Sequence, residues 1–398
     1  MSFDPAEILC ELVAIPSVNP MGRDDGSPGL GESRLTDYLH RLLAGLGLRA
    51  WRQTIAPGRD NLLARLDGPT PPENGGGLVL LDAHQDTVPV DGMTIDPWSP
   101  VVRDGRLYGR GACDTKGGMA AMIAAVARLA AERPPGMPSL LLACTVDEEY
   151  QFAGARAIVS AWPGQEAGLS RLPDASLVAE PTGLDVIVAH KGIIRWRCHA
   201  HGRAAHSSRP NQGDNAIYRM ARAVGAIERY GQEVLAAGPA HLLCGPGTLN
   251  VGTIRGGSSI NIVPERCGVE IEVRVPPGAD PHQARGDLIE YLQRQLASDP
   301  PLEHDEPYME GPALSDRANP DLAERLASIV RGLRGQCLRR GVPYATNAAF
   351  YASLGIPSVV FGPGGIEQAH TAEEWVPLDQ LDQAAEVLFQ FLRTWRPT

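Results

Sequence analysis

The sequence lacks a long apolar run, and it carries no excess of positive charge. Its longest uninterrupted apolar stretch, Met119–Ala127, is far shorter than the roughly 20 residues that a membrane-spanning helix needs. The net charge of -11 and the missing basic stripe argue against a general nucleic-acid-binding protein. We therefore expect neither a membrane nor a nucleic acid as a partner.

The cysteines and the opening residues also lack the marks of a secreted protein. Seven cysteines, an odd number, are scattered without a Cys-x-x-Cys pair, which is typical of reduced thiols. The first residues include the acidic Asp4 and no basic region before an apolar run, so they do not read as a secretory signal. We expect a cytoplasmic protein.

Two kinds of strand pattern are present in the chain. Short apolar runs at 77–86, 139–146 and 175–179 predict fully buried strands of a parallel sheet. Apolar and polar residues instead alternate over 194–201 and 269–275, which predicts antiparallel strands with one solvent-exposed face. A chain of 398 residues is longer than a domain with a single hydrophobic core usually is, so we expect two domains.

The order of these patterns predicts an α/β fold in which one domain interrupts the other. Residues 1–186 and 303–398 would form the domain with the mainly parallel sheet. Residues 187–302 would form a small inserted α+β sandwich with a four-stranded antiparallel sheet and two helices. Asp280 and Pro281 mark the start of one of these two helices. The other long helices are predicted at 119–132, 215–235, 320–333 and 378–395.

Acidic and histidine side chains follow each of the three buried strands. His84 and Asp86 end the first strand, the acidic stretch 147–149 follows the second, and Glu180 follows the third. In open α/β sheets, ligands bind outside the carboxyl ends of the strands, so these side chains are expected to share one site. The full candidate set is His84, Asp86, Asp114, Glu148, Glu149, Glu180 and His370.

This donor set suits a pair of divalent cations of the zinc type. A carboxylate shared by two ions ~3.5–4 Å apart would clamp a bridging water and lower its pKa to about 7, which makes hydroxide available to attack an amide carbonyl. A further carboxylate must stay off the metals to carry the proton to the leaving amine. Neighbouring side chains diverge, so Glu148 or Glu149 can serve, and the pattern leaves the choice open.

Six motifs, spread in order over most of the chain, resemble those of the two-zinc aminoacylase family. That family includes acetylornithine deacetylase, succinyl-diaminopimelate desuccinylase and the glutamate carboxypeptidases. The motifs are HQDTVP at 84–89, GRGACDTKGG at 109–118, DEE at 147–149, EPT at 180–182, GRAAHSS at 202–208 and QAHT at 368–371. The sequence is most similar to the acetylornithine deacetylase-like members. Ala83 and Tyr150 depart from the usual pattern without removing a ligand.

The resemblance implies a role for each candidate residue. One metal would be held by His84 and Glu180, the other by Glu149 and His370, and Asp114 would bridge them. Glu148 would be the general base, and Asp86 would be the carboxylate that orients His84.

The resemblance also implies that the inserted domain, residues 187–302, is a lid, and it extends the assignments to this lid. His206 would reach the partner subunit's site and steady the oxyanion, and Asn261 and Arg274 would contact the carboxylate end of the substrate. Two less specific readings stay open: His206 could simply end a strand, and Arg274 could be a surface ion-pair partner. Asp86 could likewise be only a cap.

The expected function is that of a metal-dependent amidohydrolase with two divalent ions, zinc most readily and cobalt or manganese as alternatives. It would remove a short acyl group from an N-acyl amino acid and act as a homodimer joined through the lid. The first alternative is a dipeptidase, glutamate carboxypeptidase or succinyl-diaminopimelate desuccinylase of the same family. A remote alternative is an inactive binding protein with the same fold.

Overall fold

The computed structural model describes residues 3–22, 29–162 and 171–396, and the chain divides into two compact units. The first unit comprises Met1–Val188, Ser315–Arg340 and Thr346–Thr398, and the second comprises Ala189–Leu314 and Gly341–Ala345. The second unit therefore extends beyond residue 302, the predicted end of the inserted domain. Two short strands that follow residue 302 pair with the sheet of the second unit, which explains the difference.

The first unit is built on an eight-stranded sheet with the order β1-β2-β6-β3-β7-β15-β8-β14. Its centre is parallel, because β3 pairs in parallel with β6 and β7, and β15 pairs in parallel with β7. Antiparallel strands flank this centre. The expected α/β fold with a mainly parallel sheet is confirmed. The strands are β1 (Arg49–Ala56), β2 (Arg59–Leu66), β3 (Leu78–His84), β6 (Ser139–Thr145), β7 (Ala175–Val178), β8 (Val186–His190), β14 (Arg339–Val342) and β15 (Ser358–Val360).

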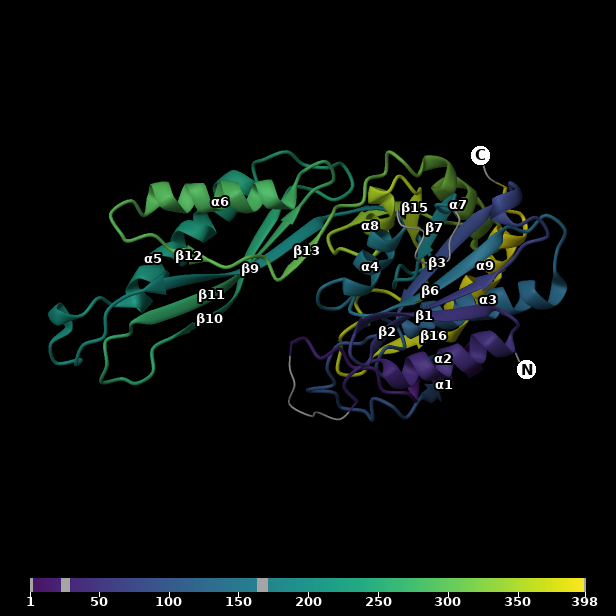
Figure 1. Cartoon of the computed structure of the whole chain (residues 1–398), viewed down its shortest axis with the longest axis horizontal. Helices are drawn as coiled ribbons and strands as arrows, with labels where there is room; N and C mark the ends of the chain where they lie inside the picture. The colour runs from purple at the N-terminus through teal and green to yellow at the C-terminus, as the bar shows by residue number, and fades with distance from the viewer. Residues whose placement is uncertain (1–2, 23–28, 163–170, 397–398) are drawn as a thin grey trace. The chain divides into compact units, whose positions relative to one another are not determined.

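Helices cover the central strands, so that every residue of β3 and β6 is buried (Figure 1). Helix α3 packs against α1 and α9, and its Ala-rich sequence allows this close approach. The helices of this unit are α1 (Pro5–Val13), α2 (Ser33–Gly45), α3 (Lys116–Glu132), α4 (Ala153–Ala161), α7 (Pro320–Arg334), α8 (Ala348–Ser353) and α9 (Leu378–Arg393). Over the ranges described above, no helix is both long and apolar enough to cross a bilayer.

A small three-stranded sheet lies beside the loop that precedes α3. It has the order β16-β5-β4 and is formed by β4 (Val101–Arg103), β5 (Arg106–Tyr108) and β16 (Trp375–Pro377). Trp375 is paired with Tyr108 in the antiparallel β16–β5 ladder. This pairing joins the segment after His370 to the segment before Asp114, although the two are far apart in sequence.

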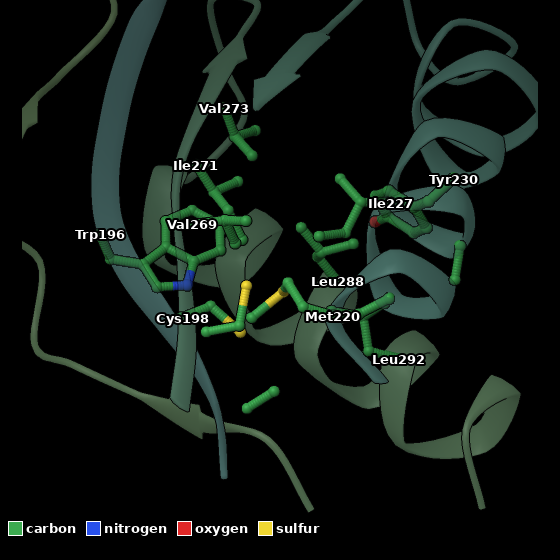
Figure 2. Close-up of a cluster of buried hydrophobic side chains, with 14 of the residues drawn as sticks. Trp196, Cys198, Met220, Ile227, Tyr230, Val269, Ile271, Val273, Leu288 and Leu292 are labelled. Carbon is green, nitrogen blue, oxygen red and sulfur yellow. The ribbon is translucent and has the colours of Figure 1, made fainter. Parts of the chain in front are cut away.

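The second unit is an antiparallel sheet covered by two helices, with five strands where four were expected. The order is β10-β11-β9-β12, and β13 also pairs with β9. Figure 2 shows the core, in which Trp196 and Ile271 of the sheet face Met220 and Leu288 of the helices. The elements are β9 (Gly192–His201), α5 (Ala216–Arg229), a π-helical turn Tyr230–Leu235, β10 (Thr248–Gly256), β11 (Arg266–Val275), α6 (Pro281–Gln295), β12 (Glu303–His304) and β13 (Met309–Gly311).

Candidate active site

The ends of three parallel strands in the first unit bring the candidate residues together. His84 is the last residue of β3 and is level with Thr145, the last residue of β6. The acidic stretch 147–149 therefore begins next to His84. Glu180 follows the end of β7, the neighbour of β3 on the other side. The shared edge that the sequence predicted is thus present in the fold.

The carboxylate of Asp114 lies between two histidines. Its Oδ1 is 3.1 Å from His84 Nε2, and its Oδ2 is 3.3 Å from His370 Nε2. His370 Nε2 is also 3.2 Å from Glu149 Oε1. Two groups of donor atoms, each within 4.8 Å of one another, share this one carboxylate. They are His84, Asp114 and Glu180, and Asp114, Glu149 and His370.

Hydrogen bonding fixes the tautomer of His84. Its Nδ1 is 2.8 Å from the backbone carbonyl oxygen of Asp86, which can only accept, so Nδ1 carries the hydrogen. In the neutral ring, Nε2 then has a free lone pair, and this nitrogen faces Asp114. The Asp86 carboxylate is 3.7 Å from Nδ1, beyond hydrogen-bond distance. Orientation of His84 by that carboxylate therefore stays a prediction.

The Asp86 carboxylate instead holds the backbone of the acidic stretch. Its Oδ1 accepts from the backbone N–H of Glu148 at 3.2 Å, and its Oδ2 accepts from that of Glu149 at 3.1 Å. Asn19 also donates to Oδ2, at 2.7 Å, and to Asp147 at 3.0 Å. Asn19 was missed from the sequence, because a single asparagine in a loop carries no pattern that would mark it.

Glu148 is buried next to the two donor groups but belongs to neither. Burial raises the pKa of Glu148 well above its ordinary value; the charge of His84 opposes this shift, and the charge of Glu149 adds to it. Burial likewise raises the pKa of Glu180, with Asp114 and Glu148 adding to the shift. The carboxylates are thus crowded together in a place that water does not screen.

The pKa values of the two histidines are raised as well, which for a histidine favours the charged form, whereas for a carboxyl group it favours the neutral form. Burial alone would lower the pKa of His370, but its contacts with Asp114 and Glu149 raise it to about 11. The pKa of His84 is also raised, because the bond to Asp114 and the charge of Asp86 outweigh burial. Although burial opposes ionisation of Asp114, its bonds to the two histidines hold the pKa of that carboxyl well below its usual range. The cluster as a whole favours added positive charge.

The residues present fit a pair of metal ions. Glu180 Oε1 is buried and has no hydrogen-bond partner among the described residues, although an unpaired buried carboxylate oxygen is costly. Imidazole nitrogen and carboxylate oxygen, without thiolate, are donors that zinc and related divalent ions accept. A cation in each donor group would offset both the crowding of carboxylates and the unpaired oxygen.

The other three candidates, His206, Asn261 and Arg274, belong to the second unit. His206 and Asn261 are exposed on two loops joined by the bond from Ser207 N to the Asn261 carbonyl oxygen, 3.0 Å. Arg274 lies on the polar face of β11, where it donates to Glu272 at 2.8 Å. The ion-pair interpretation of Arg274 therefore has a definite partner.

Comparison with known proteins gives consistent matches over almost the whole chain. Residues 80–394 match the model of Peptidase family M20/M25/M40. An acetylornithine deacetylase from Myxococcus xanthus is 33% identical over 362 residues, which cover 89% of this chain and 90% of that protein.

Solved structures agree with this match at the level of the fold. A tripeptidase from Staphylococcus aureus has a TM-score of 0.76 at 22% identity, with coverage of 98% of this chain and 97% of that one. An M20 family metallo-carboxypeptidase from Sulfolobus solfataricus has a TM-score of 0.78 at 19% identity, with 99% of each chain covered. The chain therefore belongs to peptidase family M20/M25/M40, and it is a hydrolase that acts on amide bonds.

Proposed function

We propose that this chain is a two-metal amidohydrolase that removes a short acyl group from an N-acyl amino acid and leaves a carboxylate and a free amine. The observation that carries the proposal is the Asp114 carboxylate shared by two donor groups, with Glu148 buried beside them and in neither. The acetylornithine deacetylase name of the curated relative supports N-acetylornithine, or a similar N-acetyl amino acid, as the substrate.

The proposed metal ligands divide into two sets around one bridge. His84 and Glu180 would hold one ion, Glu149 and His370 the other, and Asp114 both. Zinc is the proposed metal, with cobalt or manganese as the alternatives. When bound, such a pair of ions supplies Lewis-acid activation of the amide carbonyl and of the attacking water.

The protein itself would manage the proton. Glu148 would take a proton from the attacking water at a carboxylate oxygen and deliver it to the nitrogen of the departing amine. Asp86 would keep Glu148 in place through its bond to the Glu148 backbone N–H. Burial of Glu148 would keep bulk water from competing for that proton.

Residues of the second unit would bind the remainder of the substrate. His206 would steady the developing oxyanion, and Asn261 and Arg274 would contact the substrate carboxylate. We also propose a homodimer joined through the second unit, with His206 acting in the partner's site. The cytoplasmic location expected from the cysteines stays a prediction.

The proposal is tested with metal-loaded protein and three substrate classes: N-acetylornithine, N-succinyl-diaminopimelate and a dipeptide. We expect the first to be hydrolysed with the highest kcat/KM. Glu148→Gln should lower kcat by about 10²–10⁴-fold, because it removes the proton carrier without changing side-chain size. Its metal content, measured by mass spectrometry, should remain that of the wild type.

The matched control for this variant is Glu386→Gln, which removes a carboxylate charge from α9 in the same unit. Glu386 forms an ion pair with Arg128 of α3 at 2.6 Å, and neither residue belongs to the donor groups. Full activity in Glu148→Gln would remove Glu148 as the general base. Cleavage of the dipeptide alone would replace the deacylase assignment with a dipeptidase.

A further inference from the structure

Glu374 has a fully buried carboxylate that forms hydrogen bonds with the loop that carries Asp114. It was not among the residues predicted from the sequence, and it comes four residues after His370 and directly before β16. Its side chain has no exposed surface. It accepts four hydrogen bonds: Oε1 from the backbone N–H of Cys113 and of Asp114, both at 2.9 Å, and Oε2 from Gly111 N at 2.9 Å and Arg110 Nη1 at 2.7 Å.

Strand pairing accounts for the position of this side chain. The β16–β5 ladder begins at Trp375, one residue after Glu374, and places Trp375 opposite Tyr108. The backbone of Glu374 continues the contact, because its carbonyl oxygen accepts from Gly109 N at 3.0 Å. The Glu374 side chain therefore lies against the part of the same loop that begins at Gly111.

The distribution of these bonds argues against a role as a simple ion pair. Three of the four donors are backbone amides of the loop, and only one belongs to Arg110. Arg110 also donates to the Pro89 carbonyl oxygen at 3.1 Å, while its Nε has no hydrogen-bond partner among the described residues. A buried ion pair is weak as a stabilising device, whereas a carboxylate with all its donors aligned fixes the geometry of the backbone it binds.

The backbone that Glu374 binds includes that of Asp114, the proposed shared metal ligand. Asp114 N, bound by Glu374, is in the residue whose side chain lies between His84 and His370. The same segment that supplies Glu374 also supplies His370. One carboxylate therefore ties together two of the three residues in the second donor group, Asp114 and His370.

We propose that Glu374 is a positioning residue that sets the Asp114 carboxylate at the distance from His370 required for both metal ions. This inference rests on the proposed function in one respect, the assignment of Asp114 as the shared ligand. Asp86 offers a parallel in the same unit, since it binds the backbone N–H groups of Glu148 and Glu149. Two of the three loops that supply carboxylates to the site would then each be held by a buried carboxylate.

The experiment measures metal binding directly. Wild type, Glu374→Gln and the control Glu386→Gln are stripped of metal and titrated with Co²⁺ against a competing chelator, and their visible spectra are recorded. We expect Glu374→Gln to bind Co²⁺ about 10–100-fold more weakly and with a changed spectrum, because one carboxylate oxygen is replaced by an NH2 group, which cannot accept from the loop N–H groups. Glu386→Gln should match the wild type.

Kinetics and a second variant complete the test. With saturating metal, Glu374→Gln should show a lower kcat and a nearly unchanged KM, since a displaced bridge affects the reacting groups. If Glu374→Gln fails to fold, Glu374→Asp keeps the charge but draws the oxygens back by one methylene, and it should also bind Co²⁺ more weakly. Wild-type affinity and spectrum in a folded variant at position 374 would overturn the inference.

Failure of the proposed function would look different. If the wild type binds two metal ions but hydrolyses none of the N-acyl substrates, the deacylase assignment fails. The cobalt titration of the Glu374 variants still decides the positioning role in that case, because it requires no substrate.

Discussion

Each unit of the molecule contains a carboxylate that joins two basic side chains, and the two cases differ in what the basic partners can do. Asp114 in the first unit lies between His84 and His370. Glu272 in the second unit lies between Arg195 and Arg274, at 2.6 and 2.8 Å. Arginine keeps its charge at any ordinary pH, whereas histidine can give up its proton and bind a metal.

The surroundings of the two carboxylates differ in charge as well. Around Asp114 the carboxylates of Glu148, Glu149 and Glu180 outnumber the histidines, and burial raises the pKa of each. Around Glu272 the arginines are in excess; although burial opposes ionisation there, the bonds to the arginines lower the pKa of Glu272. The first arrangement favours a bound cation. The second leaves an excess of positive charge around Glu272.

The largest effect should come from Asp114→Asn, which keeps the shape of the bridge but removes its charge. We expect the affinity for metal to fall by about 100-fold and activity to fall with it, since both donor groups lose their shared anion. The measurement is metal content after dialysis against a chelator. Glu272→Gln is the matched control from the other unit, and it should retain both ions. Equal metal loss in the two variants would contradict the division of roles.

The second largest effect concerns the core of the second unit. Ile271 is buried on β11 against the helices (Figure 2), and Ile271→Ala should destabilise this unit by about 2–5 kcal/mol. Hydrogen exchange of the β9 and β11 amides would report the loss. Because every proposed metal ligand belongs to the first unit, metal affinity should not change. If Ile271→Ala also lowered the metal affinity, metal binding in the first unit would depend on the stability of the second.

Much of the fold could be predicted from local patterns, because they reflect burial and capping. The apolar runs at 77–86 and 139–146 became β3 and β6, which are buried on both faces. Asp280 caps α6 as predicted, accepting from His282 N at 2.9 Å. The short strands β12 and β13 were not predicted, because two or three residues carry no periodicity and their pairing with β9 depends on the tertiary fold.

The candidate site divides in the same way. His84 and Glu180 could be found because they follow apolar strands, and His370 through its motif. Glu374 and Asn19 could not be found, because they act by binding backbone N–H groups or another carboxylate from distant parts of the chain. Such roles depend on which loops meet in space, and the sequence around each residue contains no sign of the partner.

A smaller effect should appear as a pH dependence confined to the second unit. His304 Nδ1 accepts a hydrogen bond from Trp196 Nε1 at 3.1 Å, and protonation would break it. Burial lowers the pKa of His304 to about 4, and the charge of Arg285 adds to this. In the unfolded chain the pKa is about 6.5, so the unfolded state binds the proton first as pH falls. The contribution of neutral His304 to the free energy of unfolding is therefore complete above about pH 6.5 and is lost as the pH falls from about 6.5 to 4.

Hydrogen exchange of the β9 amides at pH 7.5 and pH 5, corrected for the intrinsic rates, would measure this loss. For the wild type we expect about 1–2 kcal/mol, reduced by the partial exposure of the ring. His304→Gln still offers an oxygen to Trp196 but does not titrate, so its stability should change less over the same interval. An equal change in both proteins would exclude His304 as the source.

The smallest effect should come from Arg274, for which a surface ion pair and a substrate contact are competing interpretations. Arg274→Gln removes one of the two arginines at Glu272 and leaves Arg195 in place. If Arg274 binds the substrate carboxylate, KM should rise by up to about fivefold with little change in kcat, the amount expected of a partly exposed charge pair. Arg197→Gln is the control, since Arg197 pairs with Glu270 on the same face at 3.1 Å. A rise in KM for Arg274→Gln alone supports the substrate contact, because a general loss of positive charge from the sheet would affect both variants equally.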